Sequence, residues 1–276
     1  MGISRKTDVI QLWHACGAFK TFGFSRTGKR GGPRQVSPTH RGYSYAFVSS
    51  ASIAKYYAEG FGIAFEKIIP YGVPRTDIFF DEHVRQEKRK TLYDQYPSIK
   101  DKRVILFAPT FRGDGKMSAH YEKKRFDPNV LMNQLDENDV LIIKHHPFVE
   151  LKYKIEERNR DRIFDFSRES EINDLLFITD LLITDYSSVI YEASLLTIPM
   201  LFYAYDLDNY VATRDFYSGY EHFVPGKIVR TQEELVAAVL SQDYEADKIE
   251  PFCKANFDIR DGKASERVAA FIRNLM

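Results

Sequence analysis

The sequence predicts an α/β protein with parallel sheets and helices on both faces of each sheet. Short apolar runs alternate with amphipathic segments along most of the 276 residues, which is the pattern of repeated strand–helix–strand units. Polar and charged residues directly follow several of the apolar runs, as at Lys144 and Asp185. Ligands of such sheets bind beyond the carboxyl ends of the strands, so these positions are the first candidates for a functional site.

The first part of the chain, to about residue 80, is predicted to contain three strands and one helix. Apolar and amphipathic patterns place the strands at 9–13, 45–49 and 68–72 and the helix at 52–61. A highly charged helix is predicted at 81–96, and a domain boundary is expected near residue 98. We therefore expect two domains, residues 1–98 and residues 99–276.

The second part of the chain has the clearest alternation of strands and helices. Buried apolar runs predict strands at 104–108, 140–143, 163–166, 181–183 and 200–203. Amphipathic segments predict helices at 128–134, 172–177, 189–196, 233–240 and 263–275. This order of elements is typical of a parallel sheet that has helices on both faces.

The junction between strand 181–183 and helix 189–196 is the most informative stretch. Asp185, Ser187 and Ser188 stand where the strand passes into the helix. The first N–H groups of a helix have no partner within it and the helix dipole is positive there, so this junction suits a phosphate group. The same residue types are also preferred N-caps, so capping alone explains the pattern equally well.

Composition excludes several classes of protein. Lys+Arg and Asp+Glu both total 39, so net charge indicates no partner, and we expect no nucleic acid. Cys16 and Cys253 have neither metal-ligand nor redox spacing and fit a reduced, cytosolic setting. No apolar stretch is long enough to span a bilayer, and we expect no signal peptide. The sequence shows no Asp, His or Cys cluster with metal spacing, so we expect neither a metal nor a cofactor.

Residues 9–58 form an acid-free stretch, with seven Lys and Arg but no Asp or Glu. Its glycine-rich centre contains Lys29, Arg30 and Arg34 and is predicted to be a mobile loop. The positive field of this stretch would attract phosphates, an anionic polymer or anionic lipid. A solvated surface loop without a partner remains the alternative interpretation.

Five segments resemble, in order, the motifs of one enzyme family. They are WHA at 13–15, GVPRTD at 72–77, APTFR at 108–112, KHHP at 144–147, and DYSS at 185–188 followed by Glu192. By these motifs the chain resembles the CDP-glycerol glycerophosphotransferase family, the teichoic acid primases and polymerases. The resemblance implies a GT-B-like fold of two Rossmann-like lobes. It also implies transfer of glycerol phosphate, or a related polyol phosphate, from a CDP-activated donor to a hydroxyl, with release of CMP.

The resemblance assigns roles to particular residues. His14 is expected to be the general base, because a histidine accepts a proton near neutral pH, and His146 contacts the donor pyrophosphate or protonates the departing phosphate. Six residues are expected to bind the donor and its phosphates: Arg112, Lys144, Asp185, Ser187, Ser188 and Glu192. The acceptor would be an anionic or lipid-linked polymer of teichoic acid or capsule synthesis, so Lys29, Arg30 and Arg34 are assigned to acceptor binding. This implies a cytoplasmic enzyme, with peripheral contact to the cytoplasmic face of the membrane as an option.

Structural alternatives and two departures from the family pattern stay open. His14 can be a partly buried structural histidine, Glu192 a solvent-facing helix residue, and Arg75 and Asp77 an ion pair within a turn. Ala15 stands where the family has a glycine, which is expected to alter the turn behind His14. Only a dozen residues precede Trp13, so one lobe is expected to be incomplete. Other functions that fit are a GT-B glycosyltransferase that uses a nucleotide sugar and a non-catalytic module that binds nucleotide or polymer.

Overall fold

The computed structural model describes residues 4, 6–29, 32–38, 40–113 and 115–275. The chain forms two compact units that differ from the expected domains. Unit 1 consists of Met1–Asp81, Asp208–His222 and Cys253–Met276, and unit 2 consists of Glu82–Leu207 and Phe223–Phe252. The charged helix after residue 81 thus belongs to unit 2, and the end of the chain returns to unit 1. A local sequence pattern does not reveal such a return, because it depends on contacts between distant segments.

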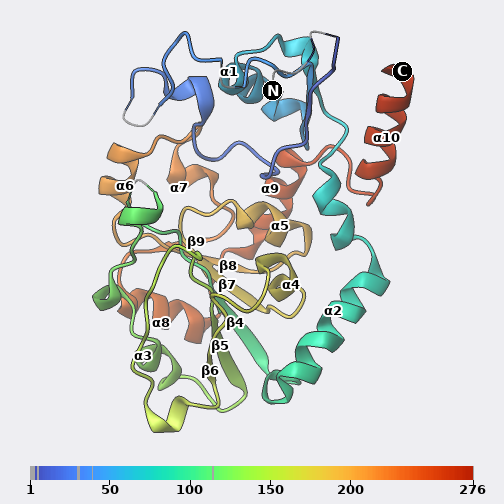
Figure 1. Cartoon of the computed structure of the whole chain (residues 1–276). Coiled ribbons are helices and arrows are strands. Elements are labelled where there is room, and N and C mark those ends of the chain that lie inside the picture. Colours follow the sequence, from blue (N-terminus) through green and yellow to red (C-terminus); the bar gives the residue numbers. More distant parts are fainter. Residues whose placement is uncertain (1–3, 5, 30–31, 39, 114, 276) are drawn as a thin grey trace. The chain divides into compact units, whose positions relative to one another are not determined.

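Unit 2 is built on a six-stranded parallel sheet (Figure 1). Its strands are β4 (Arg103–Phe107), β5 (Asp139–Ile143), β6 (Ile163–Asp165), β7 (Leu181–Thr184), β8 (Met200–Tyr203) and β9 (Lys227–Val229). They lie in the order β6-β5-β4-β7-β8-β9, which is the order of a doubly wound dinucleotide-binding sheet. The chain order reverses direction between β4 and β7, so the carboxyl ends of these two strands form the switch point where ligands of such folds bind.

Helices cover both faces of this sheet. One face packs on α3 (Pro128–Met132) and α8 (Gln232–Ser241) in a core that contains alternate residues of the strands. Ile105 shows the register, because it lies opposite Leu141 of β5 and Leu181 of β7. Figure 1 shows α2 (Glu82–Gln95), α4 (Ile172–Leu176) and α5 (Val189–Leu195) on the opposite side of the sheet.

Unit 1 contains a smaller sheet, and its core is rich in aromatic side chains. Three short parallel strands lie in sequence order: β1 (Ile10–Gln11), β2 (Tyr45–Phe47) and β3 (Ile68–Ile69). Helix α1 (Ala54–Phe61) packs with them, and Tyr57 and Phe61 are buried in this core. The expected strand 9–13 is shorter than predicted, because Trp13 has a left-handed φ of 57° that ends the extended backbone.

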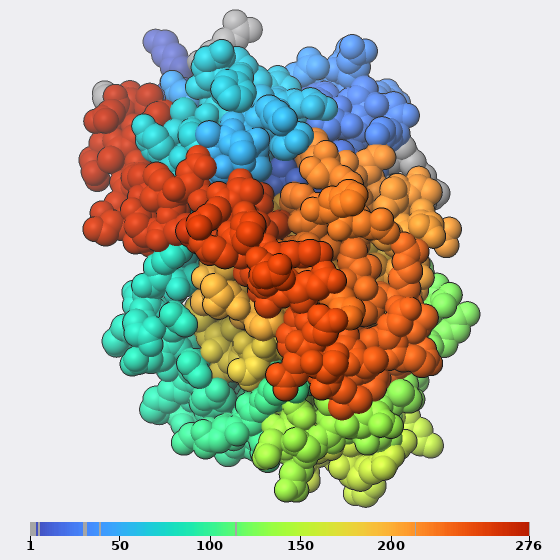
Figure 2. Space-filling model, turned by 180° about the vertical axis from the view of Figure 1, so that it is seen from behind, coloured from blue at the N-terminus to red at the C-terminus, as the bar shows by residue number. Residues whose placement is uncertain are grey.

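The C-terminal segment completes unit 1 through two carboxylates. Asp77 accepts hydrogen bonds from the backbone N–H groups of Ala264 and Ser265, at 2.9 and 2.8 Å, and so caps α10 (Ala264–Leu275). Asp258 accepts from the backbone N–H of Ala51 at 2.7 Å, next to the start of α1. Figure 2 shows the red C-terminal segment against the blue and cyan surface of the same unit.

Most of the expected elements are present, but the three-residue strand β9 and three helices were not predicted. These helices are α6 (Leu207–Thr213), α7 (Tyr220–Phe223) and α9 (Ile249–Asn256), and each contains a residue at which the chain passes from one unit to the other. Short elements of this kind show no clear apolar period. No helix in the described part of the chain combines the length and apolarity that crossing a membrane requires.

Candidate functional site

The switch point of unit 2 is organised around one buried arginine. Arg112 follows β4 and is 10% exposed, and its side chain forms ion pairs with two carboxylates. Its Nε and Nη2 donate to both oxygens of Asp206, at 2.7 and 2.8 Å, and its Nη1 donates to Asp185 at 3.0 Å. Burial opposes the charge of Arg112, but the two carboxylates outweigh it and raise the pKa of the guanidinium. One side chain thereby joins the ends of β4, β7 and β8.

Backbone groups and aromatic rings complete this cluster. Asp185 is 1% exposed and accepts from the N–H groups of Thr110 and Tyr186, at 2.7 and 2.5 Å. The Tyr186 hydroxyl donates to Asp206 at 3.0 Å. The guanidinium carbon of Arg112 also lies 5.0 to 5.8 Å from the centres of three tyrosine rings: Tyr121, Tyr186 and Tyr205. Arg112 and Asp185, both expected to bind the donor, therefore engage one another, and direct contact with phosphate stays a prediction.

The two serines after this cluster are more accessible. Ser187 and Ser188 are half-buried and precede α5. The Ser187 hydroxyl accepts from the Val189 N–H at 3.3 Å, whereas Ser188, at the N-cap position, makes no capping hydrogen bond with its side chain. Glu192 is 3% exposed within the same helix, so the alternative of a solvent-facing residue is wrong.

Residues 144–146, which follow β5, have side chains in three different environments. Lys144 donates to the carbonyls of Phe166 and Ser167, at 3.0 and 3.2 Å, and burial lowers its pKa. His145 is buried against Tyr153, and burial lowers its pKa to about 4. His146 is exposed, and its Nδ1 accepts from the Phe148 N–H at 3.2 Å.

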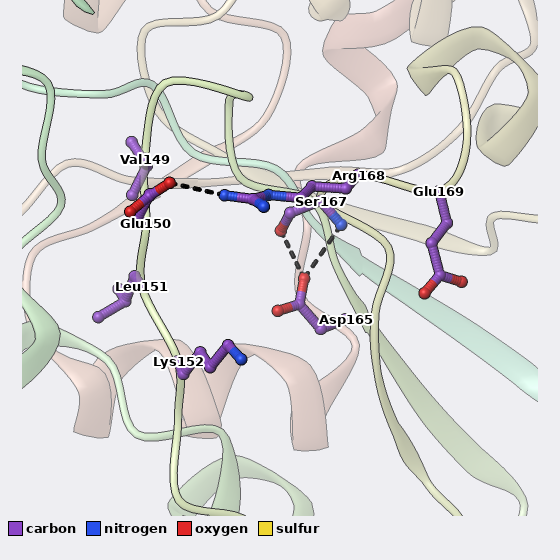
Figure 3. A pocket seen from close by; sticks show the side chains of 8 residues that line it. All are labelled: Val149, Glu150, Leu151, Lys152, Asp165, Ser167, Arg168 and Glu169. Atoms are coloured by element: carbon purple, nitrogen blue, oxygen red, sulfur yellow. Dashed lines mark hydrogen bonds and ion pairs between the residues drawn. The ribbon is translucent and has the colours of Figure 1, made fainter.

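Two cavities lie at the carboxyl ends of β5 and β6. The first has a volume of about 590 Å³, and Figure 3 shows Arg168 and Glu150 paired beside it and Ser167 hydrogen-bonded to Asp165. The second, of about 630 Å³, is lined by Lys144, the segment 167–171 and residues of α2. Both volumes are in the range of small-molecule sites. Lys144, a predicted donor-binding residue, lines the second cavity.

The predicted general base of unit 1 lies in a strained turn after β1. His14 is exposed, and its ring lies 4.4 Å from that of Trp13, the residue with left-handed backbone. Arg75 donates from Nη1 to the carbonyl oxygen of His14. Partial burial, and then the charge of Arg75, lower the pKa of His14 below its ordinary value. Ala15 is not left-handed, so the turn places its strain at Trp13 rather than at the position of the missing glycine.

The acid-free stretch forms an ion pair with an aspartate from a distant segment of unit 1. Lys29 forms an ion pair with Asp215, and the side chains are 50% and 41% exposed. Arg34 is exposed, and Arg30 lies outside the described residues. Among the described residues, no three His, Cys, Asp or Glu side chains lie close enough together to hold a metal ion. Binding of an acceptor by this stretch remains a prediction.

Sequence reasoning assigned no role to Asp206, which pairs with Arg112 as closely as Asp185 does. Asp206 follows the strand 200–203 just as Asp185 follows the strand 181–183, so its position after a buried strand was the available signal. Tyr121 lies in the long connection between β4 and α3, and burial raises its pKa. Nothing in its local sequence indicates that it packs near Arg112.

Comparisons with known proteins agree with the fold. A profile of the family described as CDP-Glycerol:Poly(glycerophosphate) glycerophosphotransferase matches residues 2–274. A solved structure of the wall teichoic acid polymerase TagF has a TM-score of 0.78 at 24% identity, over 98% of this chain and 68% of that chain. The prediction of a GT-B-like α/β fold with parallel sheets is confirmed by this likeness.

Two relatives from sequence comparison are more similar. Teichoic acid ribitol-phosphate polymerase TarL of Staphylococcus aureus (strain NCTC 8325 / PS 47) is 49% identical over 98% of this chain and 48% of its own length. Teichoic acid ribitol-phosphate primase of Bacillus spizizenii (strain ATCC 23059 / NRRL B-14472 / W23) is 41% identical, over 99% and 71%. The chain spans about half the length of the ribitol-phosphate polymerases it matches. The chain belongs to the CDP-glycerol:poly(glycerophosphate) glycerophosphotransferase family.

Proposed function

We propose that this protein transfers a polyol phosphate from a CDP-activated donor to a hydroxyl of a teichoic acid or capsule polymer and releases CMP. The observation that carries the proposal is the 49% identity to a teichoic acid polymerase over 98% of the chain. Both relatives described above are named for ribitol phosphate, so we infer that CDP-ribitol is preferred over CDP-glycerol. The acceptor is then a polyanion, which agrees with the cations of the acid-free stretch.

The proposed chemistry is a phosphoryl transfer with a histidine on the acceptor side. His14 takes the proton of the acceptor hydroxyl, whose oxygen forms a bond to the phosphorus that carries the polyol. The bond from this phosphorus to the oxygen of the CMP phosphate breaks, and CMP leaves. The exposure of His14 and its lowered pKa support this role, because the imidazole is then neutral at pH 7.

We assign the donor side to the carboxyl edge of the sheet in unit 2. Lys144 lines a cavity large enough for much of a CDP-polyol. His146 accepts a hydrogen bond at Nδ1, so its neutral ring has the proton on Nε2 and can donate it to the departing CMP phosphate. Ser187 and Ser188 bind donor phosphate, and Arg112 and Asp185 contribute by fixing the turn that carries these serines.

The remaining parts of the proposal concern the ribose and the place of the reaction. Glu192, which is buried within α5, is assigned to the ribose hydroxyls of the donor, as the family pattern implies. We place the reaction at the cytoplasmic face of the cell membrane, with a lipid-linked polymer as the acceptor and peripheral contact to the membrane. Vesicle sedimentation with and without anionic lipid tests this location separately from activity.

The test is CMP release with matched donors and variants. Purified protein is given a teichoic acid acceptor and CDP-ribitol, CDP-glycerol or a nucleotide sugar. We expect CMP release from the CDP-polyols, and His14→Ala and His146→Ala each lower turnover by about 10²–10⁴-fold without changing the melting temperature. His83→Ala, at an exposed position on α2, is the control and keeps full activity.

Three outcomes would contradict the proposal. Nucleotide release from the sugar donor alone would indicate a glycosyltransferase. Calorimetric binding of CDP-ribitol without turnover would indicate a binding module. Full turnover by His14→Ala or His146→Ala would remove that histidine from its assigned role.

A further inference from the structure

We propose that Arg75 is a positioning residue for His14: it holds the turn that carries the imidazole and places a permanent positive charge beside it. This inference rests on the proposed role of His14 as the general base. Arg75 belongs to the GVPRTD segment, for which the sequence suggested only an ion pair within a turn. The structure gives the two charged residues of this segment separate partners.

The turn that carries His14 is unusual for its bulky left-handed residue. Trp13 has a φ of 57°, a conformation in which residues other than glycine are strained. Its N–H donates to the side-chain oxygen of Gln11 at 2.7 Å. Its ring contacts those of Phe22 and Phe61, with centroids 5.2 and 5.0 Å away. The indole therefore anchors the turn on one side, and His14 extends from the anchored residue.

Arg75 holds the same turn from a second element. It lies in the 3-10 helix Pro74–Phe79, and its Nη1 donates to the carbonyl oxygen of His14. The start of this helix is itself fixed, because the Thr76 hydroxyl donates to the Val73 carbonyl at 2.8 Å. Asp77, two residues after Arg75, caps α10 with both carboxylate oxygens. Arg75 is thus aimed at the His14 turn by a segment tied to the C-terminal helix.

The charge of Arg75 has a direct consequence for the imidazole. A guanidinium remains protonated at every physiological pH, so a positive charge beside His14 disfavours the imidazolium form. Burial and the charge of Arg75 both lower the pKa of His14. Arg75 is the charged side chain that lowers the pKa of His14, and the nearby His40 ring lies 5.8 Å from that of Trp13. His14 is therefore kept neutral, and the proton that it accepts is easily passed on.

The test separates the backbone contact from the charge. Arg75→Gln removes the charge, Arg75→Lys keeps the charge but loses the planar fork, and Arg162→Gln is the control. Arg162 likewise donates to a backbone carbonyl, that of Asp139 in unit 2 at 3.1 Å. The imidazole pKa of His14 is followed by NMR in histidine-labelled protein, with the resonance assigned from His14→Ala. The pH profile of kcat/KM is measured on the same proteins.

We expect Arg75→Gln to raise the NMR pKa of His14 and to move the acid limb of the kcat/KM profile to higher pH. Both Arg75 variants should lower kcat by about 10- to 100-fold with little change in KM for the donor, because a misplaced base loses near-attack geometry. Arg75→Lys should leave the pKa of His14 close to that of the wild type. Arg162→Gln should change neither the pKa of His14 nor kcat.

The failures of the two proposals are distinguishable. If His14→Ala is inactive but both Arg75 variants have the wild-type pKa of His14 and the wild-type profile, the positioning inference is overturned and the proposed function stands. If the wild type releases no CMP from any CDP-polyol, the proposed function fails. The NMR titration then still decides the inference, because an unchanged pKa of His14 in Arg75→Gln overturns it. A normal melting temperature in Arg75→Lys excludes general unfolding as the cause.

Discussion

The two units hold their charged candidate residues in opposite ways. At the switch point of unit 2, Arg112 is 10% exposed and saturated by two carboxylates, one of them 1% exposed. In unit 1, His14 is exposed and is held through its backbone by Arg75. Both residues follow a strand, so sequence position alone treats them alike. The difference teaches that a polar residue at a strand end either builds the edge of the sheet or faces outward, and that burial decides which.

The largest effect should come from breaking the buried cluster. Arg112→Ala leaves Asp185 and Asp206 without their common cation, and removing one partner of a buried ion pair costs about 3–5 kcal/mol. Arg112→Lys should recover only part of this, because an ammonium cannot bind Asp206 through two nitrogens. Urea denaturation of the whole chain, followed by circular dichroism, measures the loss.

The matched control for this prediction is Arg85→Ala, which removes an exposed ion pair with Glu82. Exposed pairs contribute about 0–1 kcal/mol, so this variant should unfold nearly as the wild type does. Equal urea midpoints for Arg112→Ala and Arg85→Ala would mean that the ion pairs of Arg112 do not stabilise the switch point. The proposed difference between the two units would then be wrong.

The next effect concerns pH, through His145. Its folded pKa of about 4 lies below the ordinary value of 6.5, so the unfolded chain binds the proton more readily. The stability that neutral His145 contributes is complete above pH 6.5 and is lost as the pH falls to about 4. The loss is about 3 kcal/mol, at about 1.4 kcal/mol per pH unit. His145→Gln does not titrate there, so its unfolding free energy should fall less steeply between pH 6.5 and 4. Parallel curves would mean that His145 titrates normally in the folded protein.

The sequence predicted the existence of elements far better than their arrangement. Apolar runs such as 104–108 and 200–203 gave β4 and β8 because local pattern reflects burial. The sheet order could not be predicted, because pairing of β4 with both β5 and β7 depends on contacts between distant residues. For the same reason the sequence placed Arg112 and Asp185 near one another but could not show that they neutralise each other.

A smaller effect is expected at the half-buried serines of the DYSS segment. Ser188→Ala should leave stability nearly unchanged, because its side chain makes no capping hydrogen bond, and Ser187→Ala should cost no more than about 1 kcal/mol. The double variant should nevertheless weaken binding of CDP-ribitol in calorimetric titration. Ser194→Ala, within the same helix, should leave the affinity unchanged. If the affinity for CDP-ribitol is unchanged in the double variant and only the melting temperature falls, the serines stabilise the edge of the sheet and do not bind the donor.

The smallest effect is expected from the exposed cations of unit 1. Lys29→Gln with Arg34→Gln should raise KM for a polymeric acceptor and flatten its salt dependence, with little change in KM for the donor. The ion pair of Lys29 with Asp215 already reduces its field, so Asp215→Asn should lower KM for the acceptor. Identical acceptor kinetics in all three proteins across a salt series would leave the loop as a solvated surface.

The return of the chain to unit 1 also has a consequence for the order of folding. Asp77 and Ala264 are 187 residues apart, and Ser50 and Asp258, which share a hydrogen bond, are 208 apart. Contacts of such sequence separation form slowly, because a long loop must close before they contribute. During synthesis, unit 1 cannot complete its packing until residues 253–275 have been made, whereas the strands of unit 2 can pair earlier. We therefore expect unit 1 to expose apolar surface for longer than unit 2 while the chain is synthesised.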